Sequence, residues 1–160
     1  MQWLITLDTD NDSITLCRLM NTFRRKGLKI ATLAVSSRPG GYTLMAVVDS
    51  PESEVEHIFH LLRCTEGVQH VTYYQHEPSA DASFLFVDSD SGTSSIAQIL
   101  AAFPGSRLIF ASHGKYLLEI PTEIRPRSVS VGPGEPAYLP FARVKTTRNV
   151  GSPELVGAQV

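Results

Sequence analysis

Hydrophobic residues in the first half of the chain fall into six successive segments, separated by polar or glycine-containing turns. Residues 3–7 are apolar and partly β-branched, which is typical of a strand. From Ile14 to Phe23 the hydrophobic residues recur at helical spacing, and Gly27 ends this predicted helix. The other segments predict a hairpin of residues 28–35 and 42–48 around the turn 36–41, a helix from Pro51 to Gly67 and a strand at 68–74.

This order, β-α-β-β-α-β, predicts an α+β, ferredoxin-like domain at residues 1–77, with two helices on one face of a four-stranded antiparallel sheet. The other face of such a sheet needs a cover. Apolar residues of the hairpin would leave a patch too large for a monomer to expose, and we therefore expect a homodimer. The residues of this expected patch are Val35, Leu44, Ala46 and Val48.

A degenerate repeat with a period of 80 residues predicts a second, partial unit at residues 80–145. Asp8 and Asp10 correspond to Asp88 and Asp90. The helical stripe recurs as Ile96, Ile99, Leu100 and Phe103. The predicted elements are a strand at 84–87, a helix at 93–103 and strands at 108–111 and 116–120, with the last helix and strand of the unit missing.

The last forty residues hold six of the ten prolines and four of the eleven glycines, so regular structure is limited there. Its one apolar run, residues 138–144, can add an edge strand to the second unit. We expect an irregular, proline-rich tail, flexible at residues 146–160.

Composition narrows the classes of partner and compartment. Fourteen Lys and Arg against sixteen Asp and Glu give a net charge of −2, which argues against nucleic acid. No apolar stretch reaches the roughly 18 residues of a membrane span, and the N-terminus lacks a basic signal-peptide region. Cys17 and Cys64 form no CxxC, so we expect free buried thiols in a cytoplasmic protein.

Candidate chemistry is sparse. The acidic run 8–12 begins like a calcium loop, but Ser13 and Leu19 stand where Gly and a bidentate Glu are needed, so helix capping is the better interpretation. His57 and His60 lie three residues apart without a third ligand at a metal-site spacing. No nucleophile motif or phosphate loop occurs. We therefore predict no catalytic residues, no metal site and no enzyme activity of its own.

The run from Asp10 to Ile30 resembles the opening of the ACT-domain regulatory (small) subunit of acetolactate synthase, also called acetohydroxyacid synthase. That family typically reads Glu-Asn-x-x-Gly-Ala-Leu-x-Arg, followed by a spaced Phe and by Arg-Gly-Tyr-Asn-Ile. Asp10 replaces the Glu and Leu28 the Tyr. The resemblance covers residues 2–76 well and reaches residues 80–120 weakly. The residues that match as they stand are Asn11, Leu16, Arg18, Phe23, Gly27 and Ile30.

The resemblance implies a non-catalytic subunit of branched-chain amino-acid biosynthesis. Its ACT domains would dimerise, bind valine or another branched-chain amino acid at the dimer interface, and modulate a catalytic subunit that holds the thiamine diphosphate. The effector loop would comprise Asn11, Asp12, Ser13, Ile14 and Thr15, with Lys29 and Ile30 facing it from the partner protomer.

Two residues depart from the family pattern. Ile14 replaces the loop glycine, and a β-branched side chain both fills ligand space and disfavours positive φ. Lys29 replaces an asparagine. These departures favour an alternative, a stand-alone ACT-type dimerisation or amino-acid-sensing module with a lapsed or different ligand site.

Overall fold

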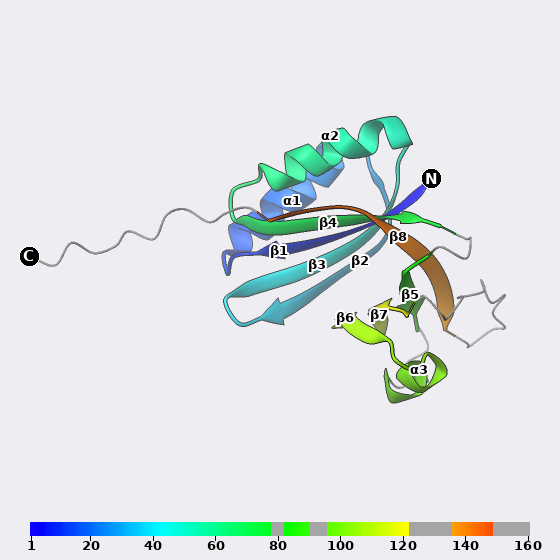
Figure 1. The fold of residues 1–160 in the computed structure, drawn as a ribbon. Coiled ribbons are helices and arrows are strands. Elements are labelled where there is room, and N and C mark those ends of the chain that lie inside the picture. The colour runs from blue at the N-terminus through cyan, green and yellow to red at the C-terminus, as the bar shows by residue number, and fades with distance from the viewer. Residues whose placement is uncertain (78–81, 90–95, 122–135, 149–160) are drawn as a thin grey trace, which may run out of the picture.

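The computed structural model describes residues 1–77, 82–89, 96–121 and 136–148, with side chains placed as far as Arg143. It has one curved, eight-stranded antiparallel sheet whose helices lie on the outside (Figure 1). The elements are β1 (Gln2–Thr9), α1 (Ser13–Arg25), β2 (Lys29–Arg38), β3 (Gly41–Asp49), α2 (Glu52–Arg63), β4 (Val68–His76), β5 (Phe84–Asp88), α3 (Ile96–Ala102), β6 (Arg107–Ser112), β7 (Lys115–Glu119) and β8 (Ala137–Arg148).

The first half confirms the predicted β-α-β-β-α-β order. Gly27 follows α1 with φ +63°, the left-handed conformation that glycine adopts without a steric penalty. The hairpin turn is narrower than expected, because β2 continues to Arg38 and leaves only Pro39 and Gly40 between the strands. Pro51 precedes α2 as its cap rather than forming its first turn.

The described strands of the second half follow the same order as those of the first. Across the sheet the strands run β2-β3-β1-β4-β8-β5-β7-β6. Read from its two ends, each half therefore follows the same pattern, with β6, β7, β5 and β8 in the places of β2, β3, β1 and β4. The predicted strands and helix of the repeat are confirmed, although Asp90 and residues 93–95 lie outside the described residues.

The expectation of a missing last strand was wrong. The apolar run at 138–144 belongs to β8, which is central, since it pairs with both β4 and β5. The strand also continues through residues 146–148, which we assigned to a flexible tail. The rest of that tail, residues 149–160, lies outside the described residues.

Pro140 is tolerated in this central strand because of its position. The amide and carbonyl of one antiparallel residue point to the same neighbour. The Pro140 carbonyl accepts hydrogen bonds from the β4 side, from Glu77 N at 3.1 Å and His76 Nδ1 at 2.9 Å. The missing N–H therefore faces the end of β4, and no bond to β5 is lost.

The chain covers both faces of its own first sheet, which corrects the argument for a dimer. Leu44, Ala46 and Val48 face α1 and α2 and are fully buried. Met45 and Val47, on the opposite face, pack against residues of the second half such as Phe86 and Phe141. Val35, on the terminal strand β2, is the one residue of the predicted patch that stays exposed. The rest of the patch is filled within one chain and does not require a second copy.

The expectation of buried thiols was wrong. Cys17 and Cys64 are free, but both are exposed rather than buried, since they lie on the outer side of the helical layer. Within the described ranges, no helix has the length and apolar character needed to cross a membrane.

Candidate functional site

The loop from β1 to α1 holds the predicted effector residues, and Asp10 organises it. Its carboxylate accepts hydrogen bonds at Oδ1 from the Thr15 hydroxyl at 2.8 Å and from Asp12 N at 3.2 Å. Its amide donates to the Gly67 carbonyl at 2.8 Å, which ties the loop to the turn before β4. Thr15 is buried, so this part of the loop is fixed from inside.

Asp12 is the N-cap of α1, as the capping interpretation predicted. Its side chain accepts a hydrogen bond from Ile14 N at 2.9 Å, and its carbonyl accepts one from Thr15 N at 3.1 Å. First-turn amides are the groups with which a helix N-terminus receives an anionic ligand. Asp12 already occupies two of them.

The other predicted loop residues are open to solvent. Asn11 and Ser13 are exposed, and Ile14 keeps 55% of its surface accessible. A ligand that reached this loop would therefore meet the Ile14 side chain at the surface.

Lys29 and Ile30 begin β2, at one end of the whole sheet. The Lys29 ammonium lies 4.0 Å from the Asp49 carboxylate and is well exposed. Ile30 keeps 37% of its surface accessible, and Leu33 and Val35 are also exposed along the same strand. The structure thus gathers the five loop residues on one segment and the other two at the sheet edge.

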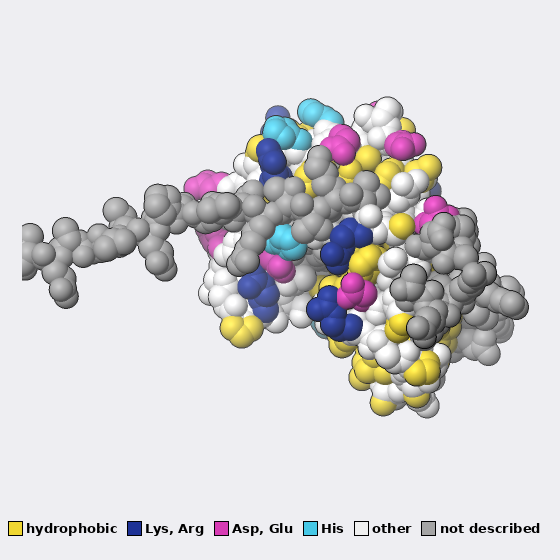
Figure 2. Space-filling view, in the orientation of Figure 1, with side chains coloured by type: hydrophobic (Ala, Val, Ile, Leu, Met, Phe, Trp, Pro, Cys, Tyr) yellow, Lys and Arg dark blue, Asp and Glu magenta, His cyan; other side chains and the backbone are white. Residues whose placement is uncertain are grey.

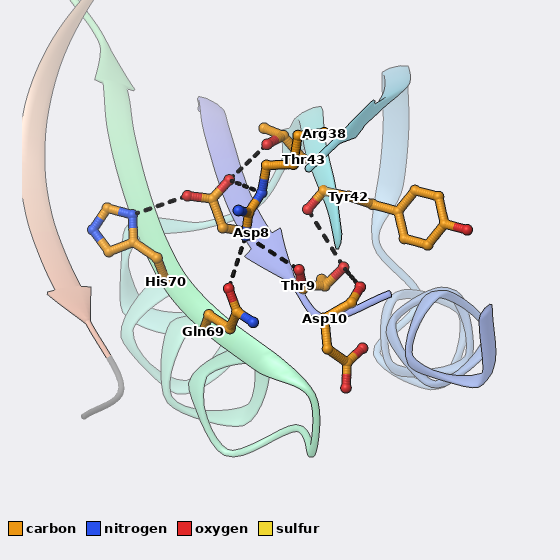
Figure 3. Close-up of polar contacts among 8 residues, drawn as sticks. All are labelled: Asp8, Thr9, Asp10, Arg38, Tyr42, Thr43, Gln69 and His70. Atoms are coloured by element: carbon orange, nitrogen blue, oxygen red, sulfur yellow. Dashed lines mark hydrogen bonds and ion pairs between the residues drawn. The ribbon is translucent and has the colours of Figure 1, made fainter. Parts of the chain in front are cut away.

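Asp8 lies apart from Asp10 and Asp12, which belong to the β1–α1 loop. It lies within β1 on the sheet face away from α1 and α2, where Figure 3 shows its carboxylate between Arg38, Thr43 and His70. Thr43 Oγ1 donates to Asp8 Oδ1 at 2.6 Å. Arg38 Nε and His70 Nδ1 lie 3.6 Å from Asp8 Oδ1 and Oδ2, respectively.

Arg38, at the end of β2, also bonds to β1 and β4. Its Nη2 donates to the Thr9 carbonyl at 3.2 Å and to Gln69 Oε1 at 2.8 Å. The cluster was missed at the level of the sequence. The signal was the polar alternation Thr6, Asp8 and His70, Thr72, which places polar side chains on one face of two strands.

The acidic and histidine residues do not assemble a metal centre among the described residues, where no group of three or more candidate ligands meets. His57 Nε2 lies 2.9 Å from Lys26 Nζ, and His60 Nε2 lies 3.7 Å from Cys64 Sγ. The two histidines therefore face different neighbours.

Comparisons with known proteins give structural likenesses only. No family model matches the sequence, and no curated protein matches it significantly. Among solved structures, the acetolactate synthase small subunit from Thermotoga maritima is 17% identical, with a TM-score of 0.46, over 95% of this chain and 99% of that one. The regulatory subunit of aspartate kinase from Thermus flavus is 11% identical, with a TM-score of 0.43, over 78% of this chain and 85% of that one. Likenesses at this level do not establish a family.

Proposed function

We propose that the chain is a non-catalytic regulatory subunit of acetolactate synthase, or a homologue of one. In this proposal it binds a branched-chain amino acid between two ACT domains and modulates a catalytic subunit that carries thiamine diphosphate. The observation that carries the proposal is the match from Asp10 to Ile30, which falls on β1–α1–β2 of a β-α-β-β-α-β half.

The matched residues lie where their chemistry is used, which supports the assignment. Phe23, near the end of α1, is buried in the core. Gly27 has a positive φ, which glycine adopts without a steric penalty. Arg18 pairs with Glu66 at 2.9 Å, in the turn that carries Gly67. The motif thus builds the helix and the loop that the resemblance assigns to the effector.

A dimer in this proposal forms through the edge of β2 rather than through the sheet face. β2 is a terminal strand whose one ladder partner in the described sheet is β3, while the Ser112 hydroxyl of β6 donates to the Val35 carbonyl at 2.9 Å. Exposed Ile30, Leu33 and Val35 add apolar surface there. Two β2 edges in contact would bring Lys29 and Ile30 of one protomer toward loop 11–15 of the other.

Among the predicted effector residues, Lys29 is the one cation for the effector's carboxylate, and its ammonium is exposed. The effector's aliphatic side chain would pack on Ile14 and Ile30. Because Asp12 caps α1, the ligand would be held by side chains rather than by free amides of the helix.

Isothermal titration of the full chain with valine, leucine and isoleucine tests the effector. We expect saturable binding of at least one of them, weakened about tenfold by Lys29→Gln because a charged hydrogen bond contributes roughly 1.5–3 kcal/mol. Arg63→Gln, on α2, is the matched control. Absence of binding by all three amino acids would rule out the effector part of the proposal.

The partner requires its own experiment, a pull-down of the catalytic subunit from the source cell. Retention of that subunit, with a changed turnover rate in the recombined pair, is the expected result. No association at micromolar concentration would rule out the regulatory-subunit proposal.

The second candidate is a stand-alone ACT-type dimerisation or sensing module. The surface position of Ile14 and the capping by Asp12 favour it, because both reduce the room and the donors left for an amino acid. A dimer in light scattering, without amino-acid binding and without a catalytic partner, would identify this alternative.

A further inference from the structure

A cleft of about 320 Å³ lies between the two halves of the chain, on the sheet face opposite α1 and α2. Its floor is formed by polar residues of β1, β3 and β4, and its far wall by β6. Lys, Arg, Asp and Glu side chains gather on this face, between the first half of the sheet and β6 (Figure 2). Volumes of roughly 300–1,000 Å³ are typical of small-molecule sites.

Arg143 of β8 is the cation of this cleft. Its guanidinium carbon lies 4.8 Å from the Phe84 ring centre and 5.7 Å from that of Tyr74, so two aromatic rings orient it. Among the residues that the structure describes, no carboxylate pairs with Arg143 within 4.0 Å. The second arginine at the cleft, Arg107, is bound at 2.9 Å through Nε to Glu119.

The phenol of Tyr74 does not neutralise this charge. Burial raises the pKa of Tyr74 above its ordinary value, and the nearby Arg143 offsets this only in part. Tyr74 therefore stays a neutral hydroxyl near pH 7, beside the guanidinium and the Thr6 side chain. The Asp8 carboxylate also lines the cleft, and it lies 3.6 Å from Arg38 Nε. Arg143 is therefore the arginine of the described lining without a carboxylate partner, and a single charge of this kind suits a monoanion better than a doubly charged phosphate.

The walls of the cleft divide into a polar and an apolar part. Thr6, Thr43 and Thr72 line the floor, where the Thr43 hydroxyl donates to Asp8 Oδ1 at 2.6 Å, and Leu108, Ile109 and Phe110 form the wall on β6. Leu108 and Ile109 keep more than a third of their surface exposed, so apolar area is available there.

We propose that this cleft binds a small organic monocarboxylate, with its carboxylate on Arg143, its polar groups on the threonine hydroxyls, and a short aliphatic portion against Leu108 and Ile109. A planar guanidinium matches a carboxylate with two parallel hydrogen bonds. The site is distinct from loop 11–15, which lies at the N-terminus of α1, so this proposal stands independently of the proposed function.

Titration of the ¹⁵N-labelled full chain with acetate, butyrate and hexanoate tests the cleft by NMR. We expect saturable shifts of amides in β1, β4 and β6, and affinity that rises from acetate to hexanoate as more apolar surface meets the β6 wall. Hexylamine, which carries the opposite charge on the same chain, is expected not to compete. Shifts that scatter over the surface, or no saturation at 20 mM, would overturn the proposal.

Variants separate binding from folding. Arg143→Gln is expected to weaken hexanoate binding about tenfold or more, and Arg143→Lys to retain most of it, because the charge is kept. Thr72→Val keeps the shape of a buried residue and removes only one hydroxyl, so it tests the floor of the cleft in a folded chain. Arg25→Gln, on α1, is the control. Equal affinity in the Arg143→Gln variant and the control would refute the assignment, as would saturable binding of inorganic phosphate stronger than that of hexanoate.

Discussion

Gly67 lies directly against Thr15. A β-carbon on Gly67 would come within 2.2 Å of the Thr15 hydroxyl oxygen and 2.6 Å of Asp10 Oδ2. The position also has φ +87°, a conformation that L side chains rarely adopt. The turn before β4 therefore needs glycine both for its backbone and for the space that the β1–α1 loop occupies.

Gly67→Ala is expected to reduce the free energy of unfolding by at least about 2 kcal/mol, through left-handed strain and loss of the Asp10–Thr15 hydrogen bond. Gly40→Ala is the matched control, since Gly40 has φ +80° but no atom within 4 Å of an added β-carbon. The loss of stability in Gly40→Ala should therefore come from backbone strain alone. Urea denaturation measures the free energy of unfolding of both variants. Equal losses would contradict the close packing of Gly67 against Thr15 and Asp10.

Asp12→Ala is expected to cost about 1 kcal/mol, because it removes the acceptor for Ile14 N at the start of α1. Asn11→Ala, one residue earlier and exposed, should change stability little. Amide hydrogen exchange in the first turn of α1 gives a local reading. Unchanged protection in the Asp12→Ala variant would mean that another group caps the helix.

Tyr73 predicts how stability depends on alkaline pH. Burial, aided by the hydrogen bond and charge of Glu56, raises the pKa of Tyr73 to about 12. In the unfolded chain the group titrates near 10. Between these values the folded state binds more protons, so stability falls as the pH rises, by up to about 1.4 kcal/mol per unit.

Tyr73→Phe should remove this contribution, while the slope that comes from Tyr74 remains. The measurement is urea denaturation at pH 9, 10 and 11, since below pH 9 the two proteins should differ by a constant amount. Parallel curves up to pH 11 would show that Tyr73 titrates normally.

Substitution of Phe141 tests how the shared core stabilises the contact between the two halves. The Phe141 side chain is fully buried in the core that Leu4, Met45 and Phe86 share. Phe141→Ala is expected to cost about 3–5 kcal/mol, and Phe141→Leu clearly less, because Leu leaves a smaller cavity. Fluorescence of Trp3 and circular dichroism should report one transition. Two separate transitions in the wild-type chain would show that the halves unfold independently.

Local pattern predicted the first half of the fold well. Helical spacing from Ile14 to Phe23, a glycine after each helix and two strands around a tight turn are all encoded within about ten residues. Because the pattern recurs after 80 residues, the same argument also predicted β5, β6 and β7. The capping role of Asp12 was predictable for the same reason, since its partner is two residues away.

Properties that depend on distant partners could not be predicted in the same way. Pro140 suggested an irregular segment, and only the position of β4 shows that its missing amide is harmless. The alternation of the hairpin was visible, but not which face meets the helices, so Leu44 and Ala46 were assigned to the wrong surface. The cleft around Arg143 needs five strands from the two halves, β1, β3, β4, β6 and β8, and has no local signature.

The position of β8 has a consequence for synthesis on the ribosome. The first half is complete once β4 has emerged, but the strand that pairs with β4 ends at Arg148, 72 residues after His76 (148 − 76). At a translation rate of roughly 5–20 residues per second, the edge of β4 stays unpaired for about 4–14 s. During that interval a neighbouring nascent chain can take the place of β8, so slow translation of the last third should favour misassembled chains.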